Sequence, residues 1–109
     1  MNEISDAYVA GLLDGEGCIY IQHYKAKYYH AVVEIGMTEK ALPLLQRIQQ
    51  QYGGRIRNIW GATEKWQAAY HWALHSKKAA YFLRKVYPFL ILKCYQAQLC
   101  IQLHEMIDA

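Results

Sequence analysis

A carboxylate between two glycines, in the run Gly15-Glu16-Gly17, ends the first predicted helix of this 109-residue chain. A carboxylate can bind a divalent cation or take part in acid–base chemistry. A negative charge at the C-terminal end of a helix is unfavourable, because it opposes the helix macrodipole. The position of Glu16 therefore favours a functional role over that of an ordinary charge facing water.

The helix that carries Glu16 is predicted to have one bare face. Ala7, Gly11 and Gly15 recur every four residues and so lie on one stripe. Ser5 is a candidate N-cap, and the apolar side chains at helical spacing are expected on the opposite face: Ile4, Tyr8, Val9, Leu12 and Leu13. Two helices with bare faces can approach closely, and two such helices would bring two copies of Glu16 together.

Four segments alternate between polar and apolar residues and are predicted to be strands. They are residues 18–24 and 28–37, joined by the basic turn 25–27, a segment that opens at Arg55, and residues 70–75. In the second segment Ala31, Val33, Ile35 and Met37 are expected to face inward, and Tyr28, His30, Val32, Glu34 and Gly36 outward. Two hairpins packed on helices leave one face of a four-stranded antiparallel sheet uncovered.

Helices are predicted between and after these hairpins. One ends at Gly53-Gly54, and another runs from Ser76 to a break at Tyr87-Pro88. A final helix is expected to have an apolar face made of Leu92, Tyr95, Leu99 and Leu103. The order of the elements predicts an αββαββα domain of the α+β (mixed α/β) class that spans residues 1–109.

The uncovered face carries side chains suited to reading DNA. A twisted ribbon fits the major groove, where arginine pairs with guanine, glutamine prefers adenine and a carboxylate accepts from cytosine. The expected DNA-binding residues are Tyr20, Gln22, Tyr24, Tyr28, His30, Glu34, Arg55, Arg57 and His71, with Lys25, Lys27 and Lys65 in the turns. The plainer alternative is an outer face that is merely solvated.

Composition narrows the class of protein. Twelve basic and nine acidic residues give a net charge of only +3, so local clustering matters more than the total. Three cysteines are an odd number without zinc-site spacing, which favours reduced thiols. The sequence has neither a signal region nor a run of about 20 apolar residues. We therefore expect an intracellular, soluble protein, in the cytoplasm or an organelle matrix, without a membrane partner.

Residues Val9 to Gly17 resemble, position by position, the LAGLIDADG motif of a homing endonuclease family. Ala10, Gly11, Asp14 and Gly17 match the letters of the motif, and Glu16 replaces its second aspartate. The resemblance implies that the motif helices of two domains pack together and that the last acid of each binds a divalent metal. It nominates Glu16 and the Gly15 carbonyl as ligands for Mg²⁺, or for another divalent metal such as Mn²⁺. The expected dimer interface is Ala7, Ala10, Gly11, Asp14 and Gly15.

Two further segments resemble the same family. Pro88 to Lys93 resembles the segment of single-motif members that carries a lysine of the catalytic site, which nominates Lys93. Met37 to Lys40 resembles the strand end at which members place a polar residue near the metal, which nominates Glu39. A favourable charge in the first turn of a helix is the alternative for Glu39. Asp14 is expected to support the helix pair rather than the chemistry.

The chain contains one motif, which resembles the members that pair as symmetric dimers. The implied function is a homing endonuclease that cuts both strands of double-stranded DNA by metal-dependent hydrolysis. Since a twofold dimer matches a site of the same symmetry, a long, near-palindromic target is expected. Two alternatives keep the fold without cleavage: a DNA-binding regulator or RNA-splicing maturase, and a module whose sheet binds protein.

Overall fold

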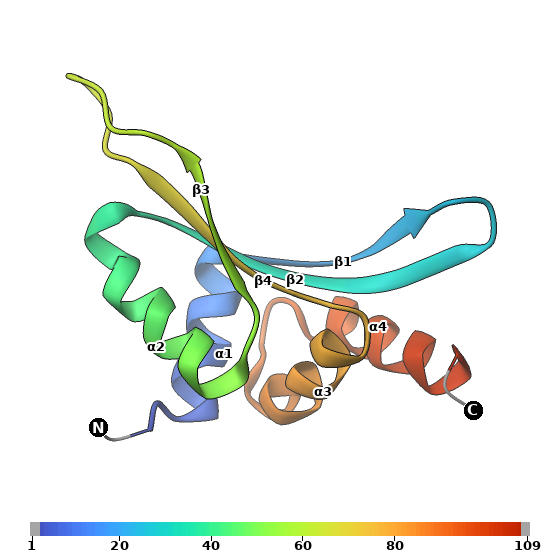
Figure 1. Cartoon of the computed structure of the whole chain (residues 1–109). Coiled ribbons are helices and arrows are strands. Elements are labelled where there is room, and N and C mark those ends of the chain that lie inside the picture. Colours follow the sequence, from blue (N-terminus) through green and yellow to red (C-terminus); the bar gives the residue numbers. More distant parts are fainter. Residues whose placement is uncertain (1–2, 108–109) are drawn as a thin grey trace.

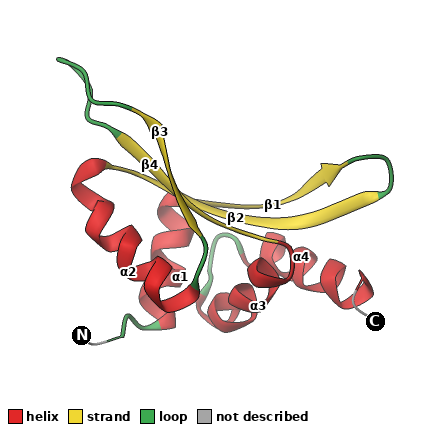
Figure 2. Ribbon diagram, viewed as in Figure 1, coloured by secondary structure: helices red, strands yellow, loops and turns green. Residues whose placement is uncertain are grey.

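The computed structural model describes residues 3–107, except for the side chain of Tyr24, and is an α+β fold (Figures 1 and 2). All the labelled helices lie on one face of the sheet, which leaves the other face uncovered. The elements follow one another as α1 (Asp6–Glu16), β1 (Gly17–Tyr24), β2 (Tyr28–Thr38), η1 (Glu39–Ala41), α2 (Leu42–Tyr52), β3 (Arg55–Trp60), β4 (Ala69–His75), α3 (Ser76–Val86), η2 (Tyr87–Phe89) and α4 (Cys94–Ile107). The predicted fold class is confirmed.

The sheet is antiparallel throughout, with strand order β1-β2-β4-β3. The predicted turn at residues 25–27 joins β1 to β2, and Lys25 and Ala26 have positive φ angles of 48° and 30° there. Gly17, at the start of β1, pairs with Ile35 of β2, and Ile35 pairs in turn with Trp72 of β4. Helix α1 therefore ends next to the middle of the sheet.

Helix α1 begins as predicted, because the Ser5 hydroxyl accepts a hydrogen bond from the Tyr8 N–H at 3.0 Å. The stripe of Ala7, Gly11 and Gly15 is exposed, as expected. Two assignments on this helix are wrong. Tyr8 is 54% exposed and so does not belong to the buried face, and Ala10 is fully buried in the core of its own chain. The Ala10 side chain is therefore not available to a second copy.

The two middle helices end where the sequence predicts. Gly53 stops α2 with a φ angle of 83°, a conformation that glycine adopts easily. Helix α3 ends at Val86 and gives way to the short turn η2, which contains Pro88. The core between these helices and the sheet is centred on Trp72 and Phe82, whose rings meet edge to face at 5.3 Å.

The predicted apolar face of α4 is wrong. Tyr95 is 67% exposed, Leu99 is 39% exposed, and Leu92 lies before the helix with 72% exposure. The buried residues of α4 are Ala97, Cys100 and His104. The Cys100 thiol donates to the Tyr20 carbonyl of β1 at 3.6 Å, and His104 Nε2 accepts a hydrogen bond from the Ala31 N–H of β2 at 3.1 Å.

Val32 points to the uncovered face as expected and is nevertheless fully buried. Its partners in the two neighbouring strands are Tyr20 and His75, which flank it on that face. All three cysteines are free thiols. Within residues 3–107, no helix has the length and apolarity needed to cross a membrane.

Candidate nucleic-acid interface and active site

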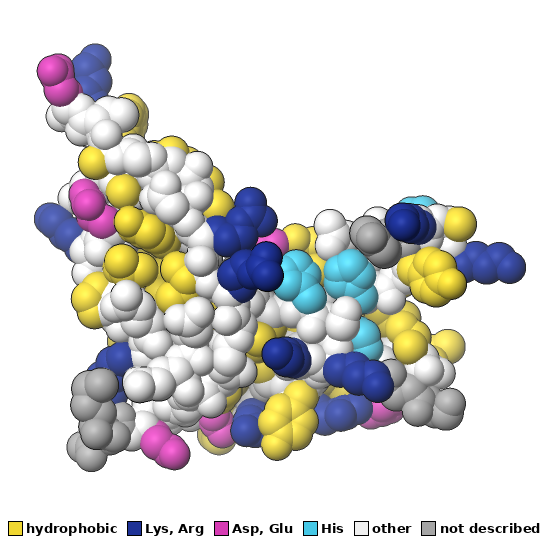
Figure 3. All heavy atoms as spheres, viewed as in Figure 1, with side chains coloured by type: hydrophobic (Ala, Val, Ile, Leu, Met, Phe, Trp, Pro, Cys, Tyr) yellow, Lys and Arg dark blue, Asp and Glu magenta, His cyan; other side chains and the backbone are white. Residues whose placement is uncertain are grey.

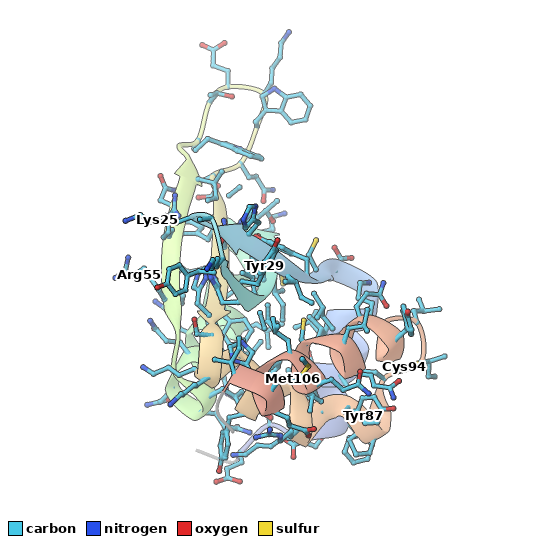
Figure 4. All side chains as sticks on the ribbon, turned by 90° about the vertical axis from the view of Figure 1, so that its right-hand side faces the viewer. Lys25, Tyr29, Arg55, Tyr87, Cys94 and Met106 are labelled. Atoms are coloured by element: carbon cyan, nitrogen blue, oxygen red, sulfur yellow. The ribbon has the colours of Figure 1, made fainter. Side chains whose placement is uncertain are left out.

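The uncovered face of the sheet has an open hollow of about 640 Å³. Six of the predicted DNA-binding residues line it together: Tyr20, Gln22, Glu34, Arg55, Arg57 and His71. Figure 3 shows Lys, Arg and His side chains gathered beside one another over the middle of the molecule. Arg55 projects on the side of the sheet away from α4, the helix that carries both Cys94 and Met106 (Figure 4). The hollow thus has the cations and hydrogen-bonding groups that nucleic acid requires.

Glu34 lines this hollow and contacts two of its other polar residues, Tyr20 and His71. The Tyr20 hydroxyl donates a hydrogen bond to Glu34 Oε1 at 2.5 Å, and His71 Nδ1 lies 3.8 Å from Glu34 Oε2. Burial and the hydrogen bond with Glu34 raise the pKa of Tyr20 to about 12, so its hydroxyl remains a donor at neutral pH. Gly36 leaves room for the His71 ring, since a Cβ at Gly36 would lie 2.6 Å from it.

The other predicted DNA-binding residues lie elsewhere. Lys25, Tyr28 and His30 line a separate hollow near the end of the β1–β2 hairpin. Lys27 is in the turn of that hairpin, and Lys65 is in the loop between β3 and β4, at the opposite end of the sheet (Figure 1). The side chain of Tyr24 is outside the described part of the chain. These residues do not meet in one site.

Six residues that line the hollow were missed, and three of them have large or polar side chains that can contact a ligand: Ile59, His75 and Lys78. The alternation that placed His71 outward also places His75 outward, so the period of β4 could have identified it. Ile59 continues the alternation of Arg55 and Arg57 along β3. Lys78 is on α3, and only the packing of that helix brings it to the rim of the sheet.

A second cluster of functional candidates lies at the C-terminal end of α1. Glu16 and Gly15 are exposed there. The Asp14 carboxylate accepts hydrogen bonds from the backbone N–H groups of Ile91 (2.7 Å), Leu92 (3.1 Å) and Lys93 (3.0 Å). The Lys93 ammonium donates to the backbone carbonyl of Asp14. The structure therefore brings Lys93 to the turn of α1 that ends at Glu16.

The Asp14 carboxylate is held in its ionised form. Burial opposes ionisation, but hydrogen bonds from the backbone of residues 91–93 and the charge of Lys93 outweigh it and lower the pKa. Asp14 was expected to support a helix pair. Its observed bonds are within one chain and reach a loop more than 70 residues away. Glu39 lies on η1, just beyond the end of β2.

The sequence model of the LAGLIDADG endonucleases matches residues 9–91, which is most of the chain. The chain belongs to the LAGLIDADG endonuclease family. None of the curated proteins matches it significantly. The predicted family is thus confirmed, and the motif of the family occupies α1 from Val9 to the first residue of β1.

Solved structures of LAGLIDADG and homing endonucleases share this fold. The homing endonuclease I-CvuI, in complex with its target in the presence of calcium, has a TM-score of 0.76 and 22% identity, covering 92% of this chain and 65% of its own. The homing endonuclease I-TnaI has a TM-score of 0.76 and 18% identity, covering 98% and 76%. The LAGLIDADG meganuclease I-AabMI, bound to uncleaved DNA, has a TM-score of 0.75 and 23% identity, covering 96% and 37%. This chain thus spans less than two thirds of the I-CvuI and I-AabMI chains.

The LAGLIDADG helix presents its bare stripe to the outside. Apart from the adjoining backbone of α1, a Cβ added at Gly11 or at Gly15 would meet no atom of residues 3–107 within 4 Å. The sequence interpretation required that no other element of the same chain packs against these glycines, and none of the described elements does. The stripe is therefore open to a partner that approaches closely.

The end of the LAGLIDADG helix offers oxygen ligands of the kind that Mg²⁺ prefers. The carbonyls of Leu13 and Asp14 accept hydrogen bonds from Gly17 and Lys93, and the Gly15 carbonyl is the next in this last turn. In the described part of the chain, no three residues of the His, Cys, Asp and Glu types are placed to hold a metal together. Within the described residues, the last turn of α1 thus carries one exposed carboxylate, that of Glu16.

Proposed function

We propose that this chain is one half of a site-specific endonuclease that cuts both strands of double-stranded DNA. Two copies pair through the exposed stripe of α1, and their two sheets lie along one long, near-palindromic target. The pairing supplies two Glu16 carboxylates to a common centre. The three free thiols fit a protein that works inside a cell.

Recognition is assigned to the uncovered sheet face. A strand of about 8 residues spans roughly 26 Å, at about 3.3 Å per residue, which corresponds to about eight base pairs. Two sheets separated by a central gap could then cover about twenty base pairs. Arg55, Arg57 and Gln22 have side chains that can pair with base edges. Lys25, Lys27 and Lys65 are assigned to phosphates, which would set the affinity and its salt dependence.

Hydrolysis is assigned to the end of α1. Glu16 and the Gly15 carbonyl would hold Mg²⁺ or Mn²⁺, with the phosphate, water and the second copy completing the ligands. When bound, such a cation lowers the pKa of water and stabilises charge on the departing oxygen. Lys93 places a positive charge beside this centre, where it can compensate the charge of the phosphate. Glu39 is proposed to order solvent at the same centre.

One observation carries this proposal. The bare stripe of α1 is not covered by the rest of the chain. It ends at the last turn of the helix, which contains Glu16 and is hydrogen-bonded to Lys93 through Asp14. A stripe that served only the core of one chain would be buried.

The proposal is tested by selecting cut sites from a pool of randomised duplexes in the presence of magnesium. The selected duplex is then used to compare the wild type with Glu16→Gln and with Glu105→Gln, a control at an exposed glutamate of α4. We expect Glu16→Gln to bind the duplex with nearly unchanged affinity and to yield no product, whereas Glu105→Gln cleaves like the wild type. Chelation of the metal should stop cleavage, and added magnesium should restore it.

Comparable cleavage by Glu16→Gln would contradict the assignment of this residue. Tight, specific binding by the wild type without product would indicate a DNA-binding regulator or a maturase. Binding that depends only weakly on salt would argue against a sheet that grips phosphates, and would favour a protein partner.

A further inference from the structure

Helix α3 has a strongly basic exposed side. None of its eleven residues is acidic, and four are exposed cations: Lys77, Lys78, Arg84 and Lys85. The whole chain has a net charge of only +3, so these four residues are a local concentration of positive charge. Figure 3 shows Lys and Arg side chains over this helix, below those that lie over the sheet. Such a concentration attracts a polyanion.

An open hollow of about 360 Å³ lies between this side of α3 and the C-terminal end of α2. We call it the α3 groove. The described residues that line it include Lys77, Lys78 and Lys85, and none of them is Asp or Glu. The groove is therefore suited to a negatively charged ligand.

The wall of the α3 groove that belongs to α2 has little left to offer such a ligand. The Gln51 side chain exchanges two hydrogen bonds with the backbone of Ile4, and the Tyr52 hydroxyl donates to the Asp6 carboxylate. These polar groups are thus already bonded within the chain. The side chains of α3 are the ones that would hold the ligand.

Tyr81 is an exposed aromatic residue in the α3 wall of the groove. Its side chain is 62% exposed, and the Lys85 ammonium lies 4.6 Å from the centroid of its ring. Lys77, Tyr81 and Lys85 are spaced four residues apart, so they lie on one stripe of α3 about 12 Å long, at about 1.5 Å per residue. An exposed ring between cations is the arrangement with which proteins bind unpaired strands, because a base stacks on the ring and phosphates meet the cations.

We infer that the α3 groove binds single-stranded nucleic acid. One unpaired base stacks on Tyr81, and the phosphates on either side of that base contact Lys77 and Lys85. The inference goes beyond the proposed function, because it requires neither two paired copies nor cleavage.

A duplex and a membrane surface fit the α3 groove less well. In a duplex the bases are already paired and stacked, so none of them can turn onto a tyrosine ring. The volume of the groove is in the range of small-ligand pockets, which suits one base. A helix that binds a membrane surface inserts an apolar face, whereas the apolar residues of α3 are buried in the core: Ala79, Phe82, Leu83 and Val86.

The test measures the binding of labelled oligouridine and labelled oligothymidine, which do not pair with themselves, by fluorescence anisotropy at two salt concentrations. We expect Tyr81→Ala to raise the dissociation constant of the strand roughly 10-fold. Tyr81→Trp keeps an aromatic ring and should bind like the wild type. Lys85→Gln should lower the salt slope by about 0.7. Tyr95→Ala, at a tyrosine of α4 that is 67% exposed, and Lys40→Gln, at an exposed lysine of η1, are the matched controls and should bind like the wild type.

All these variants alter exposed side chains, and thermal melting should find Tyr81→Ala as stable as Tyr95→Ala. The inference is overturned if Tyr81→Ala binds the strands as tightly as Tyr95→Ala. It is also overturned if Arg57→Ala weakens this binding and Tyr81→Ala does not, since the strand would then lie on the sheet. Tighter binding of oligouridine than of oligothymidine would support the inference and identify the strand as RNA, and the opposite preference would support it and identify the strand as DNA.

The inference and the proposed function can fail separately. A protein that binds single strands through Tyr81 and never cuts a duplex would keep the inference and remove the proposed function. A protein that cuts a duplex and binds neither oligonucleotide would remove the inference alone.

Discussion

Asp14 holds Lys93 at two points. Its carboxylate accepts a hydrogen bond from the Lys93 N–H, and its backbone carbonyl accepts one from the Lys93 ammonium. One residue of α1 thus fixes both the backbone and the charged group of a residue 79 positions later. The orientation of Lys93 relative to Glu16 therefore depends on Asp14.

Asp14→Asn should loosen this connection. An amide presents an NH₂ group in place of one acceptor oxygen, so at least one backbone N–H of residues 91–93 loses its partner. We expect the free energy of unfolding to fall by about 1–3 kcal/mol and the single-turnover cleavage rate to fall while DNA affinity is retained. Urea unfolding and cleavage on one preparation measure both. An unchanged cleavage rate would show that Lys93 does not need Asp14.

The contribution of the Asp14 carboxylate should also depend on pH. Its pKa in the folded chain lies below the ordinary value of 3.8, so the ionised group stabilises the fold above that value. This stabilisation is lost as the pH falls through the lowered pKa. The difference in unfolding free energy between the wild type and Asp14→Asn should therefore shrink below about pH 4. A difference that stays constant in acid would contradict this assignment.

Gly11→Leu should separate paired copies without unfolding them. A Cβ at this position meets no described atom within 4 Å apart from the adjoining backbone of its own helix, and Gly11 is exposed, so the monomer has room for a side chain there. Between two closely packed helices it would force them apart, and we expect the dimer dissociation constant to rise roughly 100-fold. Gly11→Ala is the control, because it adds a side chain yet remains small. If the two variants sediment alike, the helices do not pair along this stripe.

Gly36→Ala and Gly54→Ala make the same change with different costs. The new Cβ at Gly36 lies 2.6 Å from the His71 side chain, which can turn away, whereas at Gly54 it lies 2.6 Å from the Ala73 carbonyl in a backbone with a φ angle of 100°. We expect Gly54→Ala to lower the free energy of unfolding by about 2 kcal/mol or more, and Gly36→Ala by less than about 1 kcal/mol. Gly36→Ala should instead weaken DNA binding, because His71 leaves Glu34.

Thermal unfolding and duplex binding of the two glycine variants separate these effects. Equal destabilisation by both changes would mean that His71 is as rigid as the backbone. Unaltered DNA binding by Gly36→Ala would place His71 outside the interface.

Arg57→Ala and Lys65→Ala should distinguish base contacts from phosphate contacts. Arg57 lines the central hollow, and its loss should relax the preference at one base position by about 1–3 kcal/mol. Lys65 lies in a loop beyond the strands, and its loss should weaken binding to all sequences alike and reduce the salt slope by about one. Binding to a set of single-base variants at two salt concentrations measures both. If Arg57→Ala instead weakens binding to all sequences alike, Arg57 contacts a phosphate and not a base.

The sequence was sufficient for most of the fold, because its signals are local. The alternation of residues 18–24 and 28–37, the turn between them and the stop at Gly53 each act within a few residues. The buried face of α4 could not be predicted in this way. The large apolar residues of that segment pointed to Tyr95 and Leu99, while the close approach of the helix to the sheet selected Ala97, Cys100 and His104 instead.

The sequence identified several residues of the candidate site, but it did not show which distant residues contact one another there. Arg55, Arg57 and His71 meet in one hollow as expected, because the pairing of β3 with β4 follows from the alternation. The bonds between Asp14 and residues 91–93 connect distant parts of the chain, and no local pattern indicates them. Lys78 was missed for the same reason.

Asp14 and Lys93 are 79 positions apart in the sequence, so translation produces Glu16 and its neighbour Asp14 well before Lys93. An unfinished chain that ends before Ile91 already carries the acid at Glu16, yet it lacks Lys93. On the proposed function, a truncated product of translation would therefore be harmless to the genome. The ability to break DNA would arise only after residues 91–93 have been synthesised and have bound Asp14.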